Sequence, residues 1–586
     1  MPERSVMRRL LLVAAAWMCL PLALAAQQLT PPSTGGVGAL DRALGKLTGN
    51  KRVLVIAAHP DDEDTELLTF LSRAWGVDAA YLSLSRGEGG QNLIGTELGE
   101  ALGLIRTGEL LAARSVDGAH QFFTRGFDFG FSKSLGEADR FWPRDSMLSD
   151  VVRVIRRFRP QVLVAIFTGT PRDGHGQHQQ SGVLAQQAFE LLKDSAWGPK
   201  KFYRGARFDT TQQTLRIPSG LIDPDEGKSY LQIAMAGRSL HRSQDMGQLQ
   251  RLGNSTLRLA LIARADTRTG PDAGLFDGID TSLAPGLARY AALVDSARAA
   301  LRPRTMQALV PILTRALLEL RAHAPADFRA SREPMLEAAI ADAADIVVDA
   351  AADDNLITPG QALNVAVSVW NAGPVRARVL GASIEAPAEW SVAPAAATTD
   401  GQSDPIRAAL TTTAGVESHR FIVTAPMDAP ASEPYFLERP RISALYDWST
   451  APDSLKGEPL DPPLLTARVR LDVGGVPVTL RREVSWRFID QATGEVRRPI
   501  AVVPAVALDV NPDVLVWPVA SSEARKISVE LTNGARGPTN GELRLEVPGG
   551  WPEVAAQRFA LEGEGTRRSY SFEVRAPQGL APGAYE

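Results

Sequence analysis

The sequence is poor in cysteine, in net charge and in long apolar runs. Its 586 residues include a single cysteine, Cys19, which lies in the N-terminal apolar run. The rest of the chain has no thiol, which excludes cysteine-bound zinc, cysteine nucleophiles and disulfides and leaves His, Asp and Glu as metal ligands. The 63 basic and 67 acidic side chains leave a formal charge of −4, so we expect no nucleic-acid partner.

The N-terminus has the order of an export signal. Three arginines precede an apolar run at residues 10–24, and a small-x-small site at residues 23–25 ends it. The run is shorter than the roughly 20 residues of a membrane span, and no later segment replaces it. We therefore predict a signal peptide over 1–25 and an exported protein, periplasmic or secreted, with no membrane span after signal removal.

Strand-like and helix-like segments alternate after a predicted linker at 26–49. Continuous apolar runs typical of buried parallel strands are interleaved with segments of helical spacing. The strands are expected at 52–57, 79–84 and 161–167, and the helices at 63–74, 150–158 and 181–192. This alternation predicts a Rossmann-like, doubly wound, largely parallel α/β domain over 50–275.

The next segment, 276–352, is rich in alanine and arginine and has helical periodicity. We expect helices at 286–301, 306–323 and 333–351, with a break at Pro303 and a kink at Pro311. This part is predicted to be a helical connector.

From about residue 353 the hydrophobic period changes to two, which predicts β-sandwich, Ig-like modules at 353–505 and 506–586. Turns at Asn371 and Asn533 are followed by Trp390 and Trp551 after 19 and 18 residues, which indicates an internal repeat. The second copy stops early, so we expect a truncated module and a longer natural chain. Six of the ten tryptophans lie in this half; we favour burial between sheets over stacking on sugars.

Two clusters of chemically active residues follow predicted strands. His59, Asp61 and Asp62 follow the first, and a loop with His175 and His178 follows the strand ending at residue 167. Ligands of open α/β sheets bind at such strand ends. The acidic pair alone is explained equally well as a helix start, but its joint occurrence with the second cluster favours a site.

A catalytic zinc takes three N or O ligands and leaves one position open. His59, Asp62 and His178 can supply these ligands, which leaves Asp61 and His175 for proton transfer. We expect Zn²⁺, or another divalent metal, as the cofactor.

At these residues the chain resembles the PIG-L/LmbE-like N-deacetylase family over about residues 50–250. Residues 58–63 read Ala-His-Pro-Asp-Asp-Glu, the family's signature, and residues 175–178 read His-Gly-Gln-His where members commonly have His-Pro-Asp-His. The resemblance implies zinc ligation by His59, Asp62 and His178. It also makes Asp61 the general base and His175 the protonated partner of the oxyanion or leaving amine.

Three weaker elements agree with the resemblance. Arg106 resembles an arginine that reaches substrate hydroxyls, although a solvated Arg–Glu pair explains it equally well. Asp128 lies where the family can place a sugar-binding acid, and His241 belongs to a late His-x-Ser-Gln element that buttresses the site. The loop at 87–90 is interpreted as the rim of the site.

The resemblance implies an exported zinc hydrolase that removes the N-acetyl group from an N-acetylglucosamine-type conjugate. The expected partner is an amino-sugar or glycoconjugate substrate, and the β modules are candidates for glycan contact. Two alternatives stay open: a zinc amidase acting on another sugar-conjugate amide, and an exported glycan-binding protein without activity.

Overall fold

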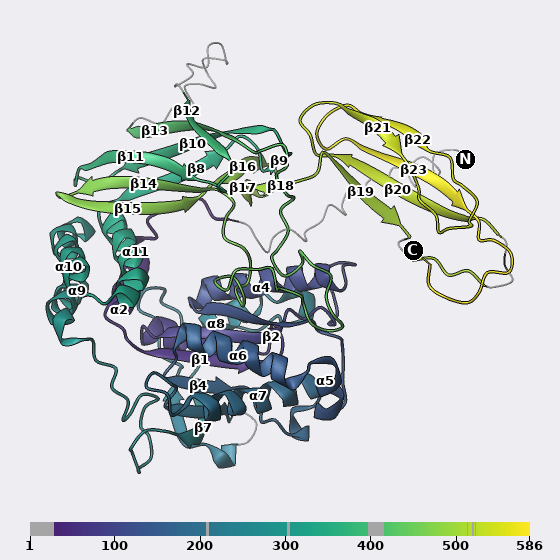
Figure 1. The fold of residues 1–586 in the computed structure, drawn as a ribbon. Helices are drawn as coiled ribbons and strands as arrows, with labels where there is room; N and C mark the ends of the chain where they lie inside the picture. Colours follow the sequence, from purple (N-terminus) through teal and green to yellow (C-terminus); the bar gives the residue numbers. More distant parts are fainter. Residues whose placement is uncertain are drawn as a thin grey trace, which may run out of the picture.

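The computed structural model describes residues 29–206, 210–301, 305–395, 415–512, 514–518, 521 and 523–585. The predicted signal peptide, with Cys19, and Pro303 lie outside these residues. Within them, no helix combines the length and the apolar character that crossing a bilayer requires. Figure 1 shows an α/β domain, a group of helices and two regions of β-sheet, one after the other along the chain.

The α/β domain is built on one seven-stranded sheet. Its strand order is β3-β2-β1-β4-β5-β7-β6, in which the first five strands are parallel, and β7 pairs antiparallel with both β5 and β6. The strands are β1 (Arg52–Ala57), β2 (Asp78–Ser85), β3 (His120–Gly126), β4 (Val162–Ala165), β5 (Lys201–Gly205), β6 (Leu215–Pro218) and β7 (Thr256–Arg264). The predicted largely parallel sheet is confirmed.

Helices cover both faces of this sheet, because β1 and its neighbours alternate buried apolar side chains between the two sides. Val53 and Val55 pack beneath α3 (Thr65–Thr69), α4 (Glu100–Asp117) and α8 (Tyr230–Arg238). Leu54 and Ile56 pack beneath α6 (Arg144–Phe158) and α7 (Gly176–Leu192), and α5 (Leu135–Phe141) packs on α7. Burial on both faces leaves the strand ends as the accessible positions for polar chemistry.

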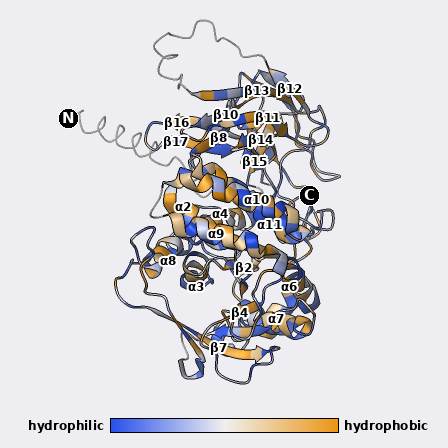
Figure 2. Ribbon diagram, turned by 90° about the vertical axis from the view of Figure 1, so that its left-hand side faces the viewer, coloured by the Kyte–Doolittle hydropathy of each residue, from blue (hydrophilic) through white to orange (hydrophobic). Residues whose placement is uncertain are grey.

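A layer of helices lies between the α/β domain and the β-sheets (Figure 2). It consists of α2 (Gly36–Leu47), α9 (Ala288–Leu301), α10 (Val310–His323) and α11 (Ala326–Ala343). On α11, Arg332 donates 2.6 Å to Asp78 of the α/β sheet, and Glu337 accepts 2.9 Å from the Thr479 amide of the β region. The layer therefore joins its two neighbours.

Three expectations for this part need correction. The predicted linker contains α2, whose leucines pack in the core of the helical layer. Pro311 lies in the first turn of α10, where a missing N–H costs nothing, and makes no kink. The helix expected at 333–351 ends at Ala343, and β8 (Ile346–Ala352) follows and joins the first β region, so the sheet begins before residue 353.

The first β region has two main sheets that share one apolar core. The larger, in the order β12-β13-β10-β8-β16-β17, buries Val365 and Val367 of β10; the smaller, β11-β14-β15, buries Val469 and Leu471 of β14. The further strands are β10 (Ala362–Asn371), β11 (Ala377–Glu385), β12 (Ser391–Ala395), β13 (Val416–Thr424), β14 (Thr466–Val473), β15 (Val476–Glu483), β16 (Ser485–Asp490) and β17 (Gly494–Pro499). β9 (Leu356–Ile357) pairs with β18 (Ala501–Val502).

The second β region repeats the centre of the first. β19 (Val506–Asn511), β20 (Arg525–Asn533) and β23 (Arg567–Val574) pair as β8, β10 and β13 do, and β21 (Thr539–Leu543) pairs with β22 (Gln557–Leu561). Sheet-rich structure is confirmed, whereas the Ig-like description stays a prediction. The tryptophan prediction is wrong in part: Trp370 is 49% exposed, and the fully buried Trp448 lies in a loop.

Candidate functional site

The carboxyl ends of four neighbouring parallel strands bring the predicted site together. His59 and Asp62 follow β1, Glu88 follows β2, Asp128 follows β3, and His178 lies at the start of α7 beyond β4. Parallel strands place these segments at one edge of the sheet, so residues more than 100 positions apart become neighbours.

The turn after β1 aims Asp62 back at His59. One carboxylate oxygen of Asp62 accepts 2.8 Å from the His59 amide and lies 3.1 Å from His59 Nδ1. Its other oxygen lies 3.3 Å from His178 Nε2. Burial opposes ionisation of Asp62, but the two imidazoles outweigh it and lower the pKa of this carboxyl well below its ordinary value.

The contacts on the far sides of these imidazoles bear on which ring nitrogen can offer a lone pair to a cation. His178 Nδ1 lies 3.0 Å from the Asp173 carbonyl, an acceptor, so Nδ1 carries the hydrogen and Nε2 is free. His59 Nε2 lies 3.8 Å from an Asp128 oxygen, beyond hydrogen-bond distance, and His59 Nδ1 offers a lone pair to a cation in the tautomer with hydrogen on Nε2. In these tautomers His59 Nδ1 and His178 Nε2 each face an Asp62 oxygen with a lone pair.

This convergence fits a cation. Tetrahedral zinc with bonds of about 2.0–2.1 Å keeps its ligands about 3.3 Å apart, close to the two Asp62–histidine separations. His59, Asp62 and His178 are thus candidates to hold a divalent metal, and the outer contacts to Asp128 and Asp173 are of the kind that orient ligating imidazoles.

The structure also brings His175 into this cluster. Ring nitrogens of His59, His175 and His178 lie within 4.8 Å of one another, which makes His175 a candidate ligand as well as a candidate catalytic residue. Burial, with the neighbouring His178 and His59, lowers the pKa of His175 to about 4. The imidazole is therefore neutral near pH 7, which differs from the protonated role that the sequence suggested.

Gln177, at the position where the resembling family has an acid, connects His175 to Asp128. Its Oε1 lies 2.8 Å from His175 Nδ1 and its Nε2 donates 3.3 Å to Asp128. Its Oε1 also accepts from Ser132, and the whole side chain is buried. A carboxylate in this place would repel Asp128, whereas the neutral amide accepts through its oxygen and donates through its nitrogen at once.

Asp61 occupies a strained position beside the cluster. Its φ of 104° is rarely adopted by a residue with a Cβ, at a cost of about 1–3 kcal/mol. The conformation is held by its amide, which donates 2.9 Å to Glu63, and by Arg238, which donates 3.0 Å to its carbonyl. Burial raises the pKa of Asp61 to about 6, against the opposing pull of Arg106, so the carboxyl can exchange a proton near neutral pH.

Arg106 lies beneath this turn and is 3% exposed. Its guanidinium donates to the Pro60 carbonyl at 2.6 Å, to the Gly87 carbonyl at 2.8 Å and to Asp61 at 3.2 Å. The structure thus uses Arg106 to join two rim loops and to face the Asp61 carboxylate. Contact with substrate hydroxyls stays a prediction.

Asp128 is also buried and engaged. Its side chain accepts 3.0 Å from the Gly130 amide, and its own amide donates 3.0 Å to Glu88. The predicted sugar contact is not tested; the described contacts place the Asp128 carboxylate beside His59.

A buried network of Glu63, His241 and Arg114 supports the Asp61 turn. Glu63 lies 2.8 Å from His241 Nε2 and 3.3 Å from Arg114, and all three are at most 4% exposed. Burial opposes the charge on Glu63, but His241 and Arg114 outweigh it and lower the pKa to about 2. The buttressing role predicted for His241 would act through this contact with Glu63. Arg114 was missed, and Glu88 and Gln177 were noted only as parts of the rim loop and of the His-Gly-Gln-His element, because a buried polar residue has no periodic signal.

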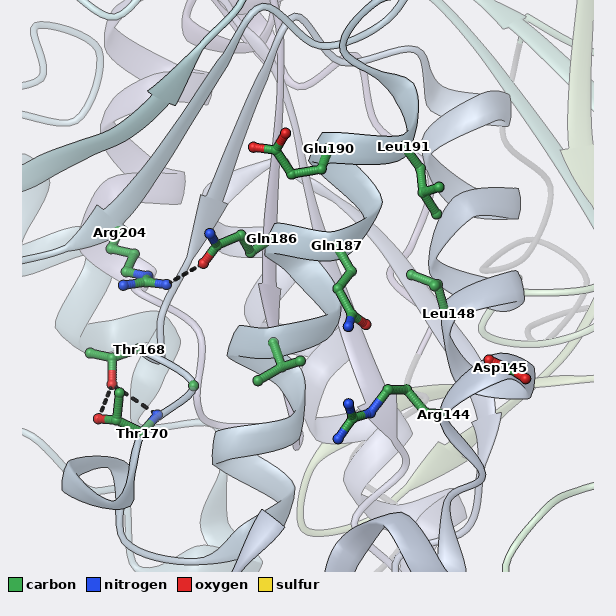
Figure 3. A pocket seen from close by; sticks show the side chains of 12 residues that line it. Arg144, Asp145, Leu148, Thr168, Thr170, Gln186, Gln187, Glu190, Leu191 and Arg204 are labelled. Carbon is green, nitrogen blue, oxygen red and sulfur yellow. Dashed lines mark hydrogen bonds between the residues drawn. The ribbon is translucent and has the colours of Figure 1, made fainter. Parts of the chain in front are cut away.

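A separate hollow of about 690 Å³ lies along α6 and α7 (Figure 3). Arg204 reaches Gln186 at 2.7 Å on one wall, and Arg144 and Leu148 form part of the opposite wall. None of the predicted site residues lines it.

The fold and the cluster together define an open α/β domain with a candidate metal site at the carboxyl ends of its strands. Residues 54–189 match the model of the PIG-L family, described as GlcNAc-PI de-N-acetylase. The chain therefore carries a PIG-L family domain.

Curated relatives agree with this assignment. The chain is 33% identical over 182 residues to a 1D-myo-inositol 2-acetamido-2-deoxy-alpha-D-glucopyranoside deacetylase of Thermobispora bispora, covering 28% of this chain and 60% of the relative. It is 29% identical over 214 residues to the enzyme of that name from Streptomyces avermitilis, covering 33% and 70%. The match spans a little under two thirds of the first relative's length.

A solved structure is similar at lower identity. The N,N'-diacetylchitobiose deacetylase from Pyrococcus horikoshii is 17% identical, with a TM-score of 0.26, over 33% of this chain and 70% of that one.

Proposed function

We propose that the PIG-L domain is a metal-dependent hydrolase that removes the N-acetyl group of an N-acetylglucosamine-type conjugate. The convergence of His59 Nδ1, both Asp62 oxygens and His178 Nε2 at 3.1–3.3 Å carries this proposal. The names of the relatives, which are deacetylases of an acetamido sugar, support the choice of bond and sugar.

In this proposal His59, Asp62 and His178 hold the metal, with zinc as the first candidate. A divalent ion bound there would polarise the acetyl carbonyl and acidify a water molecule. Asp61 takes a proton from the attacking water and returns it to the amide nitrogen as the C–N bond breaks, so that acetate and the free amine leave. The raised pKa of Asp61 suits both transfers. Neutral His175, held by Gln177, lies beside the same space.

Two further parts of the proposal concern the rest of the chain. The signal-like residues 1–25 support export to the periplasm or beyond. Arg106 and Asp128 are retained as candidates for substrate contact, and the β regions as candidates for glycan contact. The chain's own ligand set, rather than its β-sheets, carries the enzymatic part.

The decisive experiment measures bound metal and acetate release together. We expect the purified protein to hold about one equivalent of zinc, and to release acetate from at least one member of a panel of N-acetylglucosamine conjugates. Asp62→Ala is expected to lose both. Asp64→Ala is the matched control, since Asp64 belongs to the same acidic turn but caps α3 by accepting 3.0 Å from Leu67.

The possible outcomes separate the alternatives. Stoichiometric metal without acetate release would favour an amidase acting on another bond. Absence of metal from the purified protein would overturn the metal-dependent proposal and favour a binding protein.

A further inference from the structure

A loop of the first β region lies against the catalytic sheet. It runs between β13 and β14, and we call its residues 435–461 the strap; Tyr435 N donates 2.8 Å to Asp461, which closes its base. In Figure 1 the strap is the green segment that descends from the β-sheets to the α/β domain beside α4. It starts some 170 residues after the last strand of that domain.

The strap pairs with the open edge of the catalytic sheet. β3 is the edge strand, and the amides of Phe123 and Phe127 donate to strap carbonyls at 2.9 and 3.0 Å. In return the Tyr446 amide donates 2.8 Å to the Arg125 carbonyl. Backbone groups on an exposed edge would otherwise need water or another chain, so the strap both covers the edge and is fixed in register by it.

Buried side chains also stabilise the contact between the strap and the catalytic sheet. Arg86, at the end of β2, is 1% exposed and lies between the rings of Phe123 and Phe436, at 4.3 and 3.5 Å. It donates 2.7 Å to the Pro459 carbonyl of the strap. A guanidinium buried between two aromatic faces is costly to separate from its partners, because Arg86 would lose both the Phe436 ring and the Pro459 carbonyl.

One strap side chain reaches toward the metal site. The Tyr446 hydroxyl donates 2.6 Å to one oxygen of Glu88, and the other oxygen of Glu88 accepts 3.0 Å from the amide of Asp128. Asp128 in turn lies 3.8 Å from His59 Nε2. Tyr446, Glu88 and Asp128 are each at most 4% exposed, so no water competes for these contacts.

The fold makes room for this chain of contacts. A Cβ added at Gly103 of α4 would lie 2.7 Å from the Glu88 side chain, and one at Gly89 would collide with the backbone of Gly130. A buried carboxylate is expensive unless its oxygens are satisfied, and Tyr446 supplies a partner for one of the two.

We propose that Tyr446 is a positioning residue of the metal site. Through Glu88 it holds the backbone of Asp128 so that the Asp128 carboxylate orients His59, and the first β region is thereby a structural component of the catalytic centre. The inference rests on the proposed function for its catalytic meaning. The positioning itself is a claim about contacts in the protein before any substrate binds.

The test compares two tyrosines of the same strap. Tyr446→Phe removes the hydroxyl that reaches Glu88 and keeps the ring on Phe127 and Phe436. Tyr435→Phe, the matched control, removes an equally buried hydroxyl that contacts the Glu458 carbonyl, the Gly457 amide and Arg86 rather than Glu88. Tyr446→Phe loses one hydrogen bond and Tyr435→Phe loses at least two, so the control is the harsher change, and thermal unfolding checks that both fold.

The first measurement is zinc affinity of the full chain, by competition with a chromogenic chelator. Loss of a contact behind a metal ligand commonly costs 10–100-fold in affinity. We expect about a 10-fold loss for Tyr446→Phe and less than about 2-fold for Tyr435→Phe. Glu88→Gln should also weaken zinc binding, and the double variant Tyr446→Phe/Glu88→Gln should be no weaker than Glu88→Gln, because both act on the same path.

The second measurement is amide hydrogen exchange of residues 127–130 in the metal-free protein. It should quicken in Tyr446→Phe and not in Tyr435→Phe. Equal effects of the two variants on zinc affinity and on exchange would overturn the proposal and leave Tyr446 as strap packing. Zinc bound by the wild type without acetate release would refute the deacetylase proposal and leave the Tyr446 result intact. If the wild type bound no zinc, the proposal would fail with the metal site.

Discussion

The α/β domain and the first β region both rest on valine-rich strands, yet their interiors differ in kind. At the strand ends of the α/β domain, Glu63, Arg106 and His241 are buried with charge or hydrogen-bond partners, whereas Val367 and Leu471 of the β region belong to an apolar core cluster. In a parallel sheet covered on both faces, only the strand ends are accessible for chemistry. The side chains at those ends must be held in place by polar contacts. The β region contributes to these contacts through a loop, not through a strand.

The sharpest test of this difference is the change Asp61→Asn. The amide cannot take a proton from water, so kcat should fall by about 10²–10⁴-fold. Zinc content should stay near that of the wild type, because Asp61 is not among the three converging ligands. Acetate release and metal analysis on one preparation measure both; wild-type turnover by this variant would remove Asp61 as the base.

The buried network behind the site is expected to carry stability as well as geometry. Glu63→Gln removes the charge that faces His241 and Arg114 and should lower the free energy of unfolding of the α/β domain by about 3–5 kcal/mol. Urea unfolding followed by hydrogen exchange in this domain gives the value. Glu66→Gln, on the next turn, is the control with a single hydroxyl partner, Ser219. Equal losses of unfolding free energy in the two variants would show that the Glu63 network stabilises the domain no more than a single hydrogen bond does.

Truncation of an apolar core side chain in the β region should lower the stability of the protein without changing its zinc affinity or KM. Leu471 is fully buried in β14, and Leu471→Ala is expected to cost about 2–5 kcal/mol of unfolding free energy. At temperatures well below unfolding, KM and zinc affinity should be unchanged, because the strap contacts remain. Valine at this position should cost less; a change in zinc affinity at constant fold would contradict this expectation.

The smallest expected effect concerns Asp342 at the end of α11. Burial raises the pKa of this carboxyl from 3.8 to about 6, only partly opposed by Arg482, and the negative end of the helix acts in the same direction as burial. The folded state therefore holds the proton more tightly, so the contribution to stability is full below pH 4 and is lost as pH rises through about 6.

Asp342→Asn should accordingly raise stability at pH 7.5 by about 1 kcal/mol after solvent screening, and change it little at pH 4. Urea midpoints of metal-free protein at the two pH values check the sign. A larger gain at pH 4 than at pH 7.5 would be inconsistent with the raised pKa.

Much of the α/β fold could be predicted from the sequence, because buried parallel strands are continuous apolar runs and His59 and Asp62 follow one of them directly. The helix expected at 333–351 failed at its end, since valines in 346–352 suit either state and only pairing with β10 makes them a strand. Tyr446 gave no local signal, as its meaning depends on partners far away in the sequence.

By itself the sequence determined the chemistry: a chain almost without thiols, with histidines and acids at the ends of predicted strands, can hold a metal only through nitrogen and oxygen. Tertiary structure decided which atoms meet. It turned Asp62 between two imidazoles, left His175 neutral, placed Arg106 under the Asp61 turn, and brought Tyr446 from the β region to Glu88. The physical reason is that ligation and pKa depend on separations of a few ångströms, which the fold sets and residue order does not.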